Sequence, residues 1–157
     1  MFKPWQKLNR PASHLELGQL GEKLAAEFLL QAGYRLVATN FTAPIGYSLS
    51  GRPVTGEIDL VAYDETRLPF VLSFIEVKTR RSRAFAAPQA AVDRRKQRQI
   101  VKTARLYRRM LRVADEPYRY DVVSVLLLAG AAPQLELLRG YFGETSFAHS
   151  HWRQREY

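Results

Sequence analysis

Residues 56–81 read GEIDLVAYDETRLPFVLSFIEVKTRR, and the architecture is most readily inferred from this segment. Within it, residues 56–63 and 70–79 are rich in β-branched and aromatic side chains, and a polar turn lies between them. We predict two strands joined by that turn. The second strand is apolar on both faces, which is typical of a buried central strand. Glu76 and Lys78 lie at its end and, being two residues apart, project from the same face.

The first of these strands carries a second acid that can meet Glu76. Strict alternation places Ile58, Leu60 and Ala62 on one face and Asp59 on the other. If the strands pair, Asp59 and Glu76 converge, and two carboxylates repel each other unless a cation lies between them. Mg²⁺ is bound by a few carboxylates, waters and a substrate phosphate oxygen. Such an ion polarises a phosphate and lowers the pKa of a bound water.

Lys78 completes a set of groups that can hydrolyse a phosphodiester. Two residues beyond Glu76, it can reach the same water or the phosphate. The alternative is purely structural, an ion pair in which Lys78 neutralises Asp59 or Glu76. The spacing alone does not separate the two interpretations.

The composition indicates one domain and excludes several kinds of site. One hundred and fifty-seven residues are enough for a proper core, and the absence of cysteine excludes disulfides and thiolate metal sites. The N-terminus has no apolar signal segment, and the longest apolar run, residues 122–132, is too short to span a bilayer. We therefore expect a cytoplasmic protein without a membrane partner.

Positive charge is concentrated in one segment of the chain. The formal net charge is +9, and residues 78–112 contain thirteen Lys or Arg and one acid, Asp93. This segment carries +12, whereas the rest of the chain carries −3. A basic block directly after the candidate site indicates a polyanionic partner. One alternative is a helix with a solvated charged face. A membrane-surface helix is a weaker alternative, because this segment lacks a strong Trp/Phe/Leu face.

The order of the predicted elements gives the fold class. We expect an α/β protein, a sandwich with a central mixed sheet of about five strands flanked by helices. The expected segments are an arm (1–16), a nuclease-like domain (17–139) and a C-terminal tail (140–157). Within the domain we expect helices over 17–32 and 89–112, strands over 34–40, 56–63, 70–79, 118–128 and 134–138, and an insertion loop over 42–55.

Three short motifs resemble one family. They are GQLGEKLA at residues 18–25, GEIDL at 56–60 and EVKTR at 76–80. Together they resemble the bacterial YraN-like family of uncharacterised predicted endonucleases, which carry the PD-(D/E)XK signature and are similar in arrangement to archaeal Holliday-junction resolvases. The resemblance covers roughly residues 17–127 and implies a restriction-endonuclease-like sandwich. The family usually lacks the long segment before GEIDL, so residues 42–55 look like an insertion.

The resemblance also implies roles for the site residues. Asp59 and Glu76 would hold Mg²⁺, with Mn²⁺ as a substitute, and the Val77 carbonyl would be a further ligand. Glu22 would complete the site, directly or through water. Lys78 would orient or deprotonate the attacking water. Without the resemblance, Glu22 would be read as a first-turn glutamate stabilised by the helix dipole.

The basic helix supplies candidate nucleic-acid contacts. Lys96 falls on an apolar row of this helix, and Gln89 lies two turns before it on the same face, so both could touch phosphate. Snorkelling of Lys96 from the edge of the core is the alternative. The further candidates, which would follow the backbone without reading bases, are Arg80, Arg81, Arg83, Arg94, Arg95, Arg98, Lys102 and Arg105.

The sequence therefore favours a Mg²⁺-dependent endonuclease that acts on duplex, branched or structured DNA in repair or recombination. The first alternative is a non-catalytic accessory protein that binds nucleic acid through helix 89–112. A basic protein of a ribonucleoprotein particle, preferring RNA, is the second. A resolvase cuts two strands and needs two active sites, so that activity would require a homodimer.

Overall fold

The computed structural model describes residues 13–82 and 92–144 of the chain. Its elements, in chain order, are α1 (His14–Gln31), β1 (Tyr34–Tyr47), β2 (Pro53–Asp64), β3 (Val71–Arg80), α2 (Arg94–Met110), β4 (Tyr118–Leu126) and β5 (Gln134–Phe142). Each predicted helix and strand is present, with bounds that differ from the expected ones. Within these residues, neither helix is long and apolar enough to cross a membrane.

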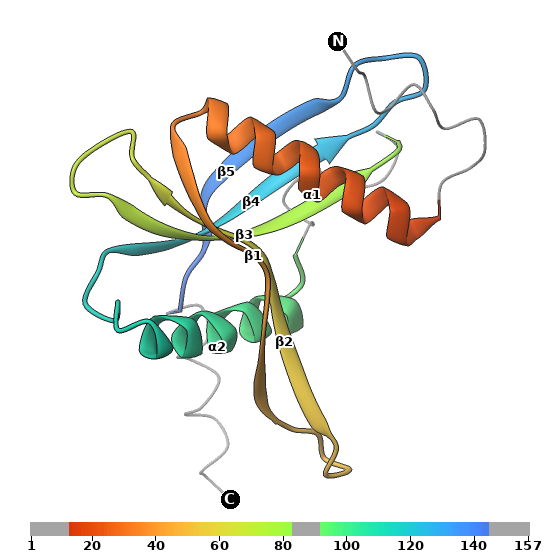
Figure 1. The fold of residues 1–157 in the computed structure, drawn as a ribbon. Coiled ribbons are helices and arrows are strands. Elements are labelled where there is room, and N and C mark those ends of the chain that lie inside the picture. The colour runs from red at the N-terminus through yellow and green to blue at the C-terminus, as the bar shows by residue number, and fades with distance from the viewer. Residues whose placement is uncertain (1–12, 83–91, 145–157) are drawn as a thin grey trace, which may run out of the picture.

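The five strands form one mixed sheet in the order β1-β2-β3-β4-β5 (Figure 1). Neighbouring strands are antiparallel except β3 and β4, which run parallel. A parallel pair needs a crossover connection, and α2 lies within this one. α1 covers one face of the sheet and α2 the other. The predicted architecture, a central mixed sheet of about five strands flanked by helices, is confirmed.

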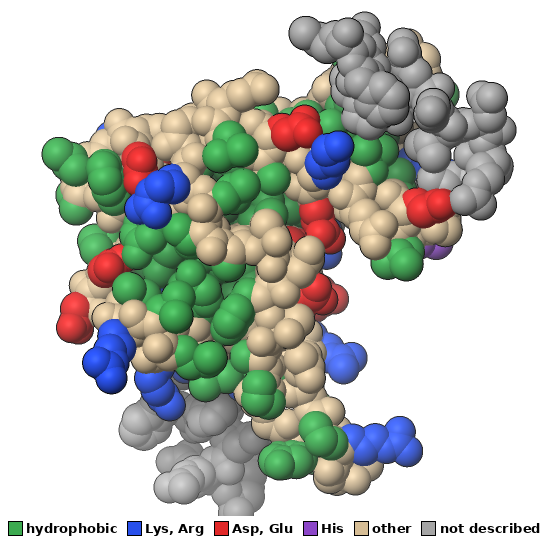
Figure 2. Space-filling view, viewed as in Figure 1, with side chains coloured by type: hydrophobic (Ala, Val, Ile, Leu, Met, Phe, Trp, Pro, Cys, Tyr) green, Lys and Arg blue, Asp and Glu red, His purple; other side chains and the backbone are tan. Residues whose placement is uncertain are grey.

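Residues 42–55, expected as an insertion loop, instead form the distal half of the β1–β2 hairpin. Strand pairing continues to Tyr47 opposite Pro53. The prolines are tolerated because β1 is an edge strand and Pro53 is the first residue of β2. A register shift between Pro44 and Gly46 accommodates the irregularity. The distal hairpin projects beyond the sheet and leaves a hollow between itself and α1 (Figure 2).

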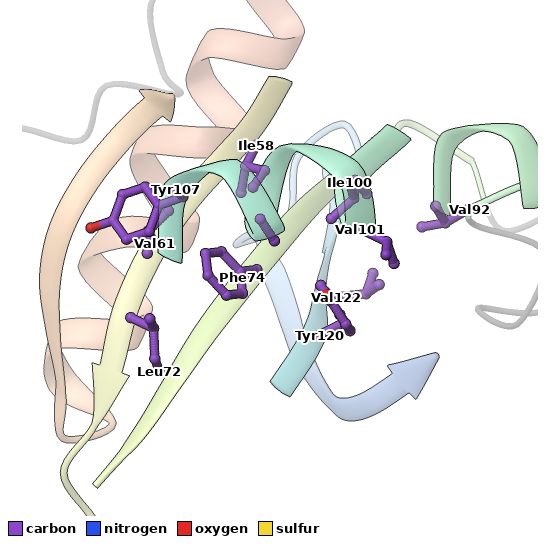
Figure 3. Close-up of a cluster of buried hydrophobic side chains, with 11 residues drawn as sticks. Ile58, Val61, Leu72, Phe74, Val92, Ile100, Val101, Tyr107, Tyr120 and Val122 are labelled. Carbon is purple, nitrogen blue, oxygen red and sulfur yellow. The ribbon is translucent and has the colours of Figure 1, made fainter. Parts of the chain in front are cut away.

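The central strand β3 is buried on both faces, as its sequence predicts. Leu72 and Phe74 pack in the cluster under α2 (Figure 3). Ile75 and Val77 pack in the cluster under α1. Because two separate cores hold this strand, the positions of the charged residues at its end are fixed by packing.

β2 does not keep the strict alternation that its sequence predicts. Leu60 packs in the α1 cluster, whereas Ile58, expected on the same face, packs with Val61 in the α2 cluster. The break lies where Asn40 of β1 adopts a positive φ of 49°. A left-handed residue turns an extended chain, and we attribute to it the rotation of the distal hairpin toward α2.

The start of α1 is set by a capping box at Ser13. The Ser13 hydroxyl accepts the Glu16 N–H at 3.2 Å, and the Glu16 carboxylate accepts the Ser13 N–H at 2.8 Å. Residues 13–16 therefore belong to the capped helix rather than to the arm predicted over 1–16. Residues 1–12 lie outside the described part of the chain.

The other predicted bounds shift for similar local reasons. Asp93 caps α2 by accepting the Lys96 N–H at 2.8 Å, so this helix begins at Arg94. The prediction for residues 89–91 falls outside the described residues. β5 extends to Phe142, into the segment predicted as a tail. The rest of that segment, residues 145–157, lies outside the described part of the chain.

Candidate active site

Asp59 and Glu76 come together where β2 and β3 separate. The pairing of the two strands ends at Leu60 opposite Ile75. One residue further, the Asp59 side chain replaces the backbone as the partner of β3, because its Oδ2 accepts the Val77 N–H at 2.7 Å. Asp59 is 9% exposed and Glu76 3%. Two carboxylates are thereby held in one buried site at the end of the central strand.

Two lysines face the Glu76 carboxylate. Lys78 Nζ lies 2.8 Å from Oε1, and Lys96 Nζ lies 3.3 Å from Oε2. The second contact is an ion pair without hydrogen-bond alignment, so the buried Oε2 accepts no hydrogen bond from the described residues. An unsatisfied buried acceptor is costly. This oxygen is therefore a position at which a further ligand would be favourable.

The structural ion pair that the sequence left open is thus formed, between Lys78 and Glu76. The Lys78 side chain is 32% exposed, so its ammonium group both neutralises the buried acid and remains accessible from the surface. Lys96 interrupts the apolar row of α2 because it reaches the same acid. The Lys96 side chain is 28% exposed and its ammonium group is paired with Glu76, so it does not simply extend from the edge of the core into water.

The electrostatics of the site disfavour a negative charge on Asp59. Burial, and after it the charge of Glu76, raise the pKa of Asp59 to about 7. The hydrogen bond from the Val77 N–H and the charge of Lys96 act in the opposite direction. A carboxyl group with this pKa gains from a nearby cation, because the cation stabilises its charged form.

α1 brings Glu22 to the same site. The helix lies close against the end of β3 because Gly21 has no side chain, and a Cβ there would be 1.8 Å from Thr79 Oγ1. Burial raises the pKa of Glu22, a side-chain hydrogen bond with Asn40 lowers it, and the charge of Glu57 raises it. The charges of Glu76 and Lys96 also act on the pKa of Glu22, so this side chain lies within the electrostatic field of the site.

The donor set fits a cation that needs few protein ligands. Residues 13–82 and 92–144 contain no group of three or more Asp, Glu, His or Cys side chains arranged to hold a metal ion. Mg²⁺, however, is commonly bound through one or two carboxylates, with waters and substrate phosphates as the other ligands. Asp59 and Glu76 supply two hard oxygen donors, and the unsatisfied Oε2 is one of these oxygens. Acidic side chains also line the hollow between α1 and the distal hairpin (Figure 2).

The predicted nucleic-acid contacts on α2 are mostly at the surface. Arg105 is exposed, but its guanidinium group forms an ion pair with Glu144 and is therefore already engaged within the protein. Lys96 is paired with Glu76, as described above. The remaining four are exposed along the first half of the helix: Arg94, Arg95, Arg98 and Lys102.

The other predicted contacts follow β3. Arg80 is half-buried as the last residue of the strand, and Arg81 is exposed directly after it. Arg83 and Gln89 lie outside the described residues, so their predicted contacts remain predictions.

A second charged cluster lies on the opposite face of the sheet, toward the start of β3. Arg119 Nε donates to Asp121 Oδ1 at 2.7 Å, and Arg119 Nη2 donates to Asp64 Oδ2 at 2.8 Å. Asp121 also accepts the Ser73 hydroxyl, and Asp64 accepts the Tyr34 hydroxyl. Asp121 thus forms a structural ion pair with Arg119, and the charges of this cluster compensate one another.

Two residues near the site were not predicted from the sequence. Asn40 contributes its left-handed backbone and its hydrogen bond with Glu22. Glu57 contributes charge to the field that acts on Glu22. Signals for both existed: asparagine is among the residues that most readily adopt a positive φ, and Glu57 lies two residues before Asp59 in the same motif.

Comparison with known proteins places the chain in a family. The model of Uncharacterised protein family UPF0102 matches residues 21–125. A UPF0102 protein of Trichlorobacter lovleyi is 40% identical over 126 residues, which are 80% of this chain and 89% of the relative. A UPF0102 protein of Solibacter usitatus is 41% identical over 145 residues, 90% of this chain and 97% of the relative.

Among solved structures, the comparison finds Archaeoglobus fulgidus Hjc, a Holliday junction resolvase from an archaeal hyperthermophile. The likeness has a TM-score of 0.35 and 15% identity, and it covers 84% of this chain and 93% of that chain. On the strength of the family match and of these relatives, the chain belongs to Uncharacterised protein family UPF0102, which confirms the family predicted from its motifs.

Proposed function

We propose that this protein is a metal-dependent endonuclease that hydrolyses phosphodiester bonds of structured or branched DNA in repair or recombination. One observation carries the proposal: Asp59 and Glu76 are buried together, and Glu76 Oε2 has no hydrogen-bond donor among the described residues. Two desolvated acids destabilise a fold unless a cation offsets their repulsion. A strongly shifted pKa in a cluster of unlike charges is typical of a functional site.

The carboxylates are the candidate metal ligands. Asp59 and Glu76 would hold Mg²⁺, or Mn²⁺ in its place, with the Val77 carbonyl as a further ligand and Glu22 reaching the ion directly or through water. When bound, such an ion polarises a phosphate and lowers the pKa of a bound water.

Lys78 would act on the substrate. Its ammonium group is held 2.8 Å from Glu76, and the side chain is partly exposed, so the group can donate to the attacking water or to a phosphate oxygen. An ammonium paired with a carboxylate donates hydrogen bonds and does not accept them. Of the two roles implied by the family, we therefore assign to Lys78 the orientation of water and the stabilisation of transition-state charge.

Lys96 would connect binding to the site. It comes from the first turn of α2 and lies 3.3 Å from Glu76. The exposed arginines of the same helix would contact the phosphate backbone, which gives salt-dependent binding with little dependence on sequence. DNA seated on α2 would therefore lie beside the buried carboxylates.

A cleavage assay tests the proposal. Linear duplex, single-stranded, flap and four-way-junction DNA would be incubated with Mg²⁺ or Mn²⁺ and wild-type protein, Asp59→Ala, Lys78→Ala or the exposed control Asp115→Asn. We expect cleavage by wild type and the control, and loss of cleavage with retained DNA binding in the other two. Cleavage that survives Asp59→Ala would overturn the proposal.

A second candidate function has one observation in its favour. Lys78 and Lys96 together neutralise Glu76 without a metal, as a non-catalytic nucleic-acid-binding accessory protein would need. The two functions differ in metal binding, which electron paramagnetic resonance of Mn²⁺ measures directly. If the protein is an accessory protein, wild type and Asp59→Ala should bind Mn²⁺ equally or not at all. If it is an endonuclease, wild type should bind Mn²⁺ and Asp59→Ala should not.

A further inference from the structure

The tip of the β1–β2 hairpin exposes two large apolar side chains. Tyr47 is 78% exposed, and Leu49 is fully exposed at 112%. The rest of the turn is small or polar, with Ser48, Ser50 and Gly51 beside them. Single exposed apolar residues are common on protein surfaces, so exposure alone decides nothing. The position of this pair, on the most distal part of a projecting hairpin, is what requires an explanation (Figure 1).

The hairpin is built to hold this tip in place. The Ser48 N–H donates to the Arg52 carbonyl at 2.8 Å, and the Gly51 N–H donates to the Ser48 carbonyl at 2.9 Å. The Arg52 N–H donates to the Ser48 hydroxyl at 3.1 Å. Strand pairing reaches Tyr47 opposite Pro53, directly below the turn. The apolar tip is therefore ordered before any partner arrives, which reduces the entropy lost on binding.

α2 braces the base of the same hairpin. Gly56 lies so close to the helix that a Cβ there would be 2.0 Å from Thr103 Oγ1. Phe41 and Tyr107 make an edge-to-face contact with ring centroids 4.9 Å apart. The hairpin and the helix that carries the exposed arginines therefore form one unit, and a ligand bound to the helix meets the hairpin in a fixed orientation.

We propose that the tip, Tyr47 with Leu49, inserts as an apolar wedge between base pairs of bound DNA and so selects branched or distorted DNA. The inference rests on the proposed function for the identity of the partner. Proteins that kink or open DNA commonly insert Leu, Phe or Met between base steps while nearby cations hold the phosphates. Arg52, exposed beside the tip, supplies such a cation here.

The length of the hairpin gives the position of the distortion. Pro53, at the base of the turn, lies six positions before Asp59, which corresponds to about 20 Å of extended strand. At 3.4 Å for each base along a strand, this is about six base pairs. Branched DNA, whose bases near the branch are less firmly stacked, would admit the wedge at lower cost than a continuous duplex. We therefore expect the branch to lie about six base pairs from the cleaved phosphate.

A binding experiment without catalysis tests the wedge. Wild type, Leu49→Ser and Tyr47→Ser would be titrated against a four-way junction and a linear duplex with the same arms, in Ca²⁺ without Mg²⁺ or Mn²⁺. The DNA carries 2-aminopurine at the branch, so fluorescence reports unstacking while anisotropy reports affinity. Leu68→Ser is the matched control, because Leu68 is 83% exposed on the separate β2–β3 turn.

We expect wild type and Leu68→Ser to raise 2-aminopurine fluorescence and to prefer the junction. Leu49→Ser should show no fluorescence increase, and its preference for the junction over the duplex should fall about tenfold. Tyr47→Ser should show a smaller loss of both. Unchanged fluorescence and preference in Leu49→Ser would overturn the wedge but leave the endonuclease proposal standing. Absence of any DNA binding by wild type would overturn both.

A membrane is the other partner that an apolar tip with a nearby cation could meet. Vesicles of phosphatidylcholine with one third phosphatidylserine would therefore be tested with the same four proteins. We expect none of them to sediment with the vesicles. Sedimentation of wild type that Leu49→Ser abolishes, without a change in DNA binding, would assign the tip to lipid and overturn the wedge.

Discussion

Asp59→Asn should make the metal-free protein more stable. The substitution removes a negative charge that burial and Glu76 both disfavour. The Asn side-chain oxygen can still accept the Val77 N–H, which Asp59 Oδ2 accepts at 2.7 Å. Its amide group can donate toward Glu76, whose Oε2 has no donor among the described residues. The variant therefore loses the charge and keeps the hydrogen bonds.

The expected gain follows from the pKa of Asp59. A pKa of about 7 in the folded protein, against 3.8 in a model compound, corresponds to about 4 kcal/mol of destabilisation when the group is fully ionised. Asp59 is only 9% exposed, so solvent screens little of this effect. For a chain of this length, about 4 kcal/mol corresponds to a rise in Tm of roughly 8–16 °C.

The sign of the pH dependence is opposite to that of a salt-bridged acid. Because the folded state holds the Asp59 proton more tightly than the unfolded state, stability falls as pH rises. The loss begins above pH 3.8 and is complete above about pH 7. The advantage of Asp59→Asn should therefore be about 4 kcal/mol at pH 8.5 and about 1 kcal/mol at pH 4.5.

Urea unfolding in EDTA, at pH 8.5 and pH 4.5, measures this difference. Asp115→Asn is the control, since Asp115 is exposed in the connection after α2 and its substitution should change the free energy of unfolding by less than about 0.5 kcal/mol. The reasoning fails if Asp59→Asn is no more stable than wild type at pH 8.5. It fails equally if the advantage is the same at both pH values.

Wild type and Asp59→Asn should also differ in their response to a metal ion. Mg²⁺ at ten times its Kd stabilises a folded protein by about 1.4 kcal/mol, and this rise is expected for wild type and not for Asp59→Asn. Thermal unfolding in EDTA and in Mg²⁺ measures it. An equal rise in both proteins would place the ion elsewhere and contradict the proposed ligand set.

Three further substitutions test local contacts that stabilise the fold. Gly21→Ala should destabilise the protein by about 1–3 kcal/mol in urea unfolding, because a Cβ would lie 1.8 Å from Thr79 Oγ1; an unchanged midpoint would contradict the close helix–strand approach. Arg119→Met should cost about 3–5 kcal/mol, since it leaves the fully buried Asp121 without its ion pair, and a loss below 1 kcal/mol would refute this. Ser13→Ala should cost about 1 kcal/mol and fray the start of α1, visible as faster amide exchange there; unchanged exchange would count against the capping box.

The parts of the site that could be predicted depend on local periodicity. Glu76 and Lys78 project together because period-2 alternation holds throughout β3, which is packed on both faces. Lys96 stood out because it interrupts an apolar row at helical spacing, and its partner proves to be the buried Glu76. In each case the informative signal was a charged residue at a position whose neighbours are buried.

The parts that could not be predicted depend on contacts between distant segments. Prolines and glycines in residues 42–55 are local signals for a loop, but strand pairing with an edge strand overrides them. The change of face at Ile58 originates in Asn40, a residue of the neighbouring strand. Alternation within β2 alone therefore contains no trace of it.

The stability of this protein and its proposed activity make opposite demands on the same carboxylates. A core optimised for stability would place apolar side chains at the end of a strand that is buried on both faces. Here the raised pKa of Asp59 lowers stability at neutral pH, and one oxygen of Glu76 has no hydrogen-bond donor in the described part of the chain. Lys96 reduces the repulsion without removing it, because its charge lowers the pKa of Asp59 less than burial and Glu76 raise it. The negative charge of this cluster is only partly compensated by the protein, which fits a site at which a bound cation supplies the missing positive charge. The free energy of unfolding in EDTA therefore measures what these carboxylates cost the fold when no cation is bound.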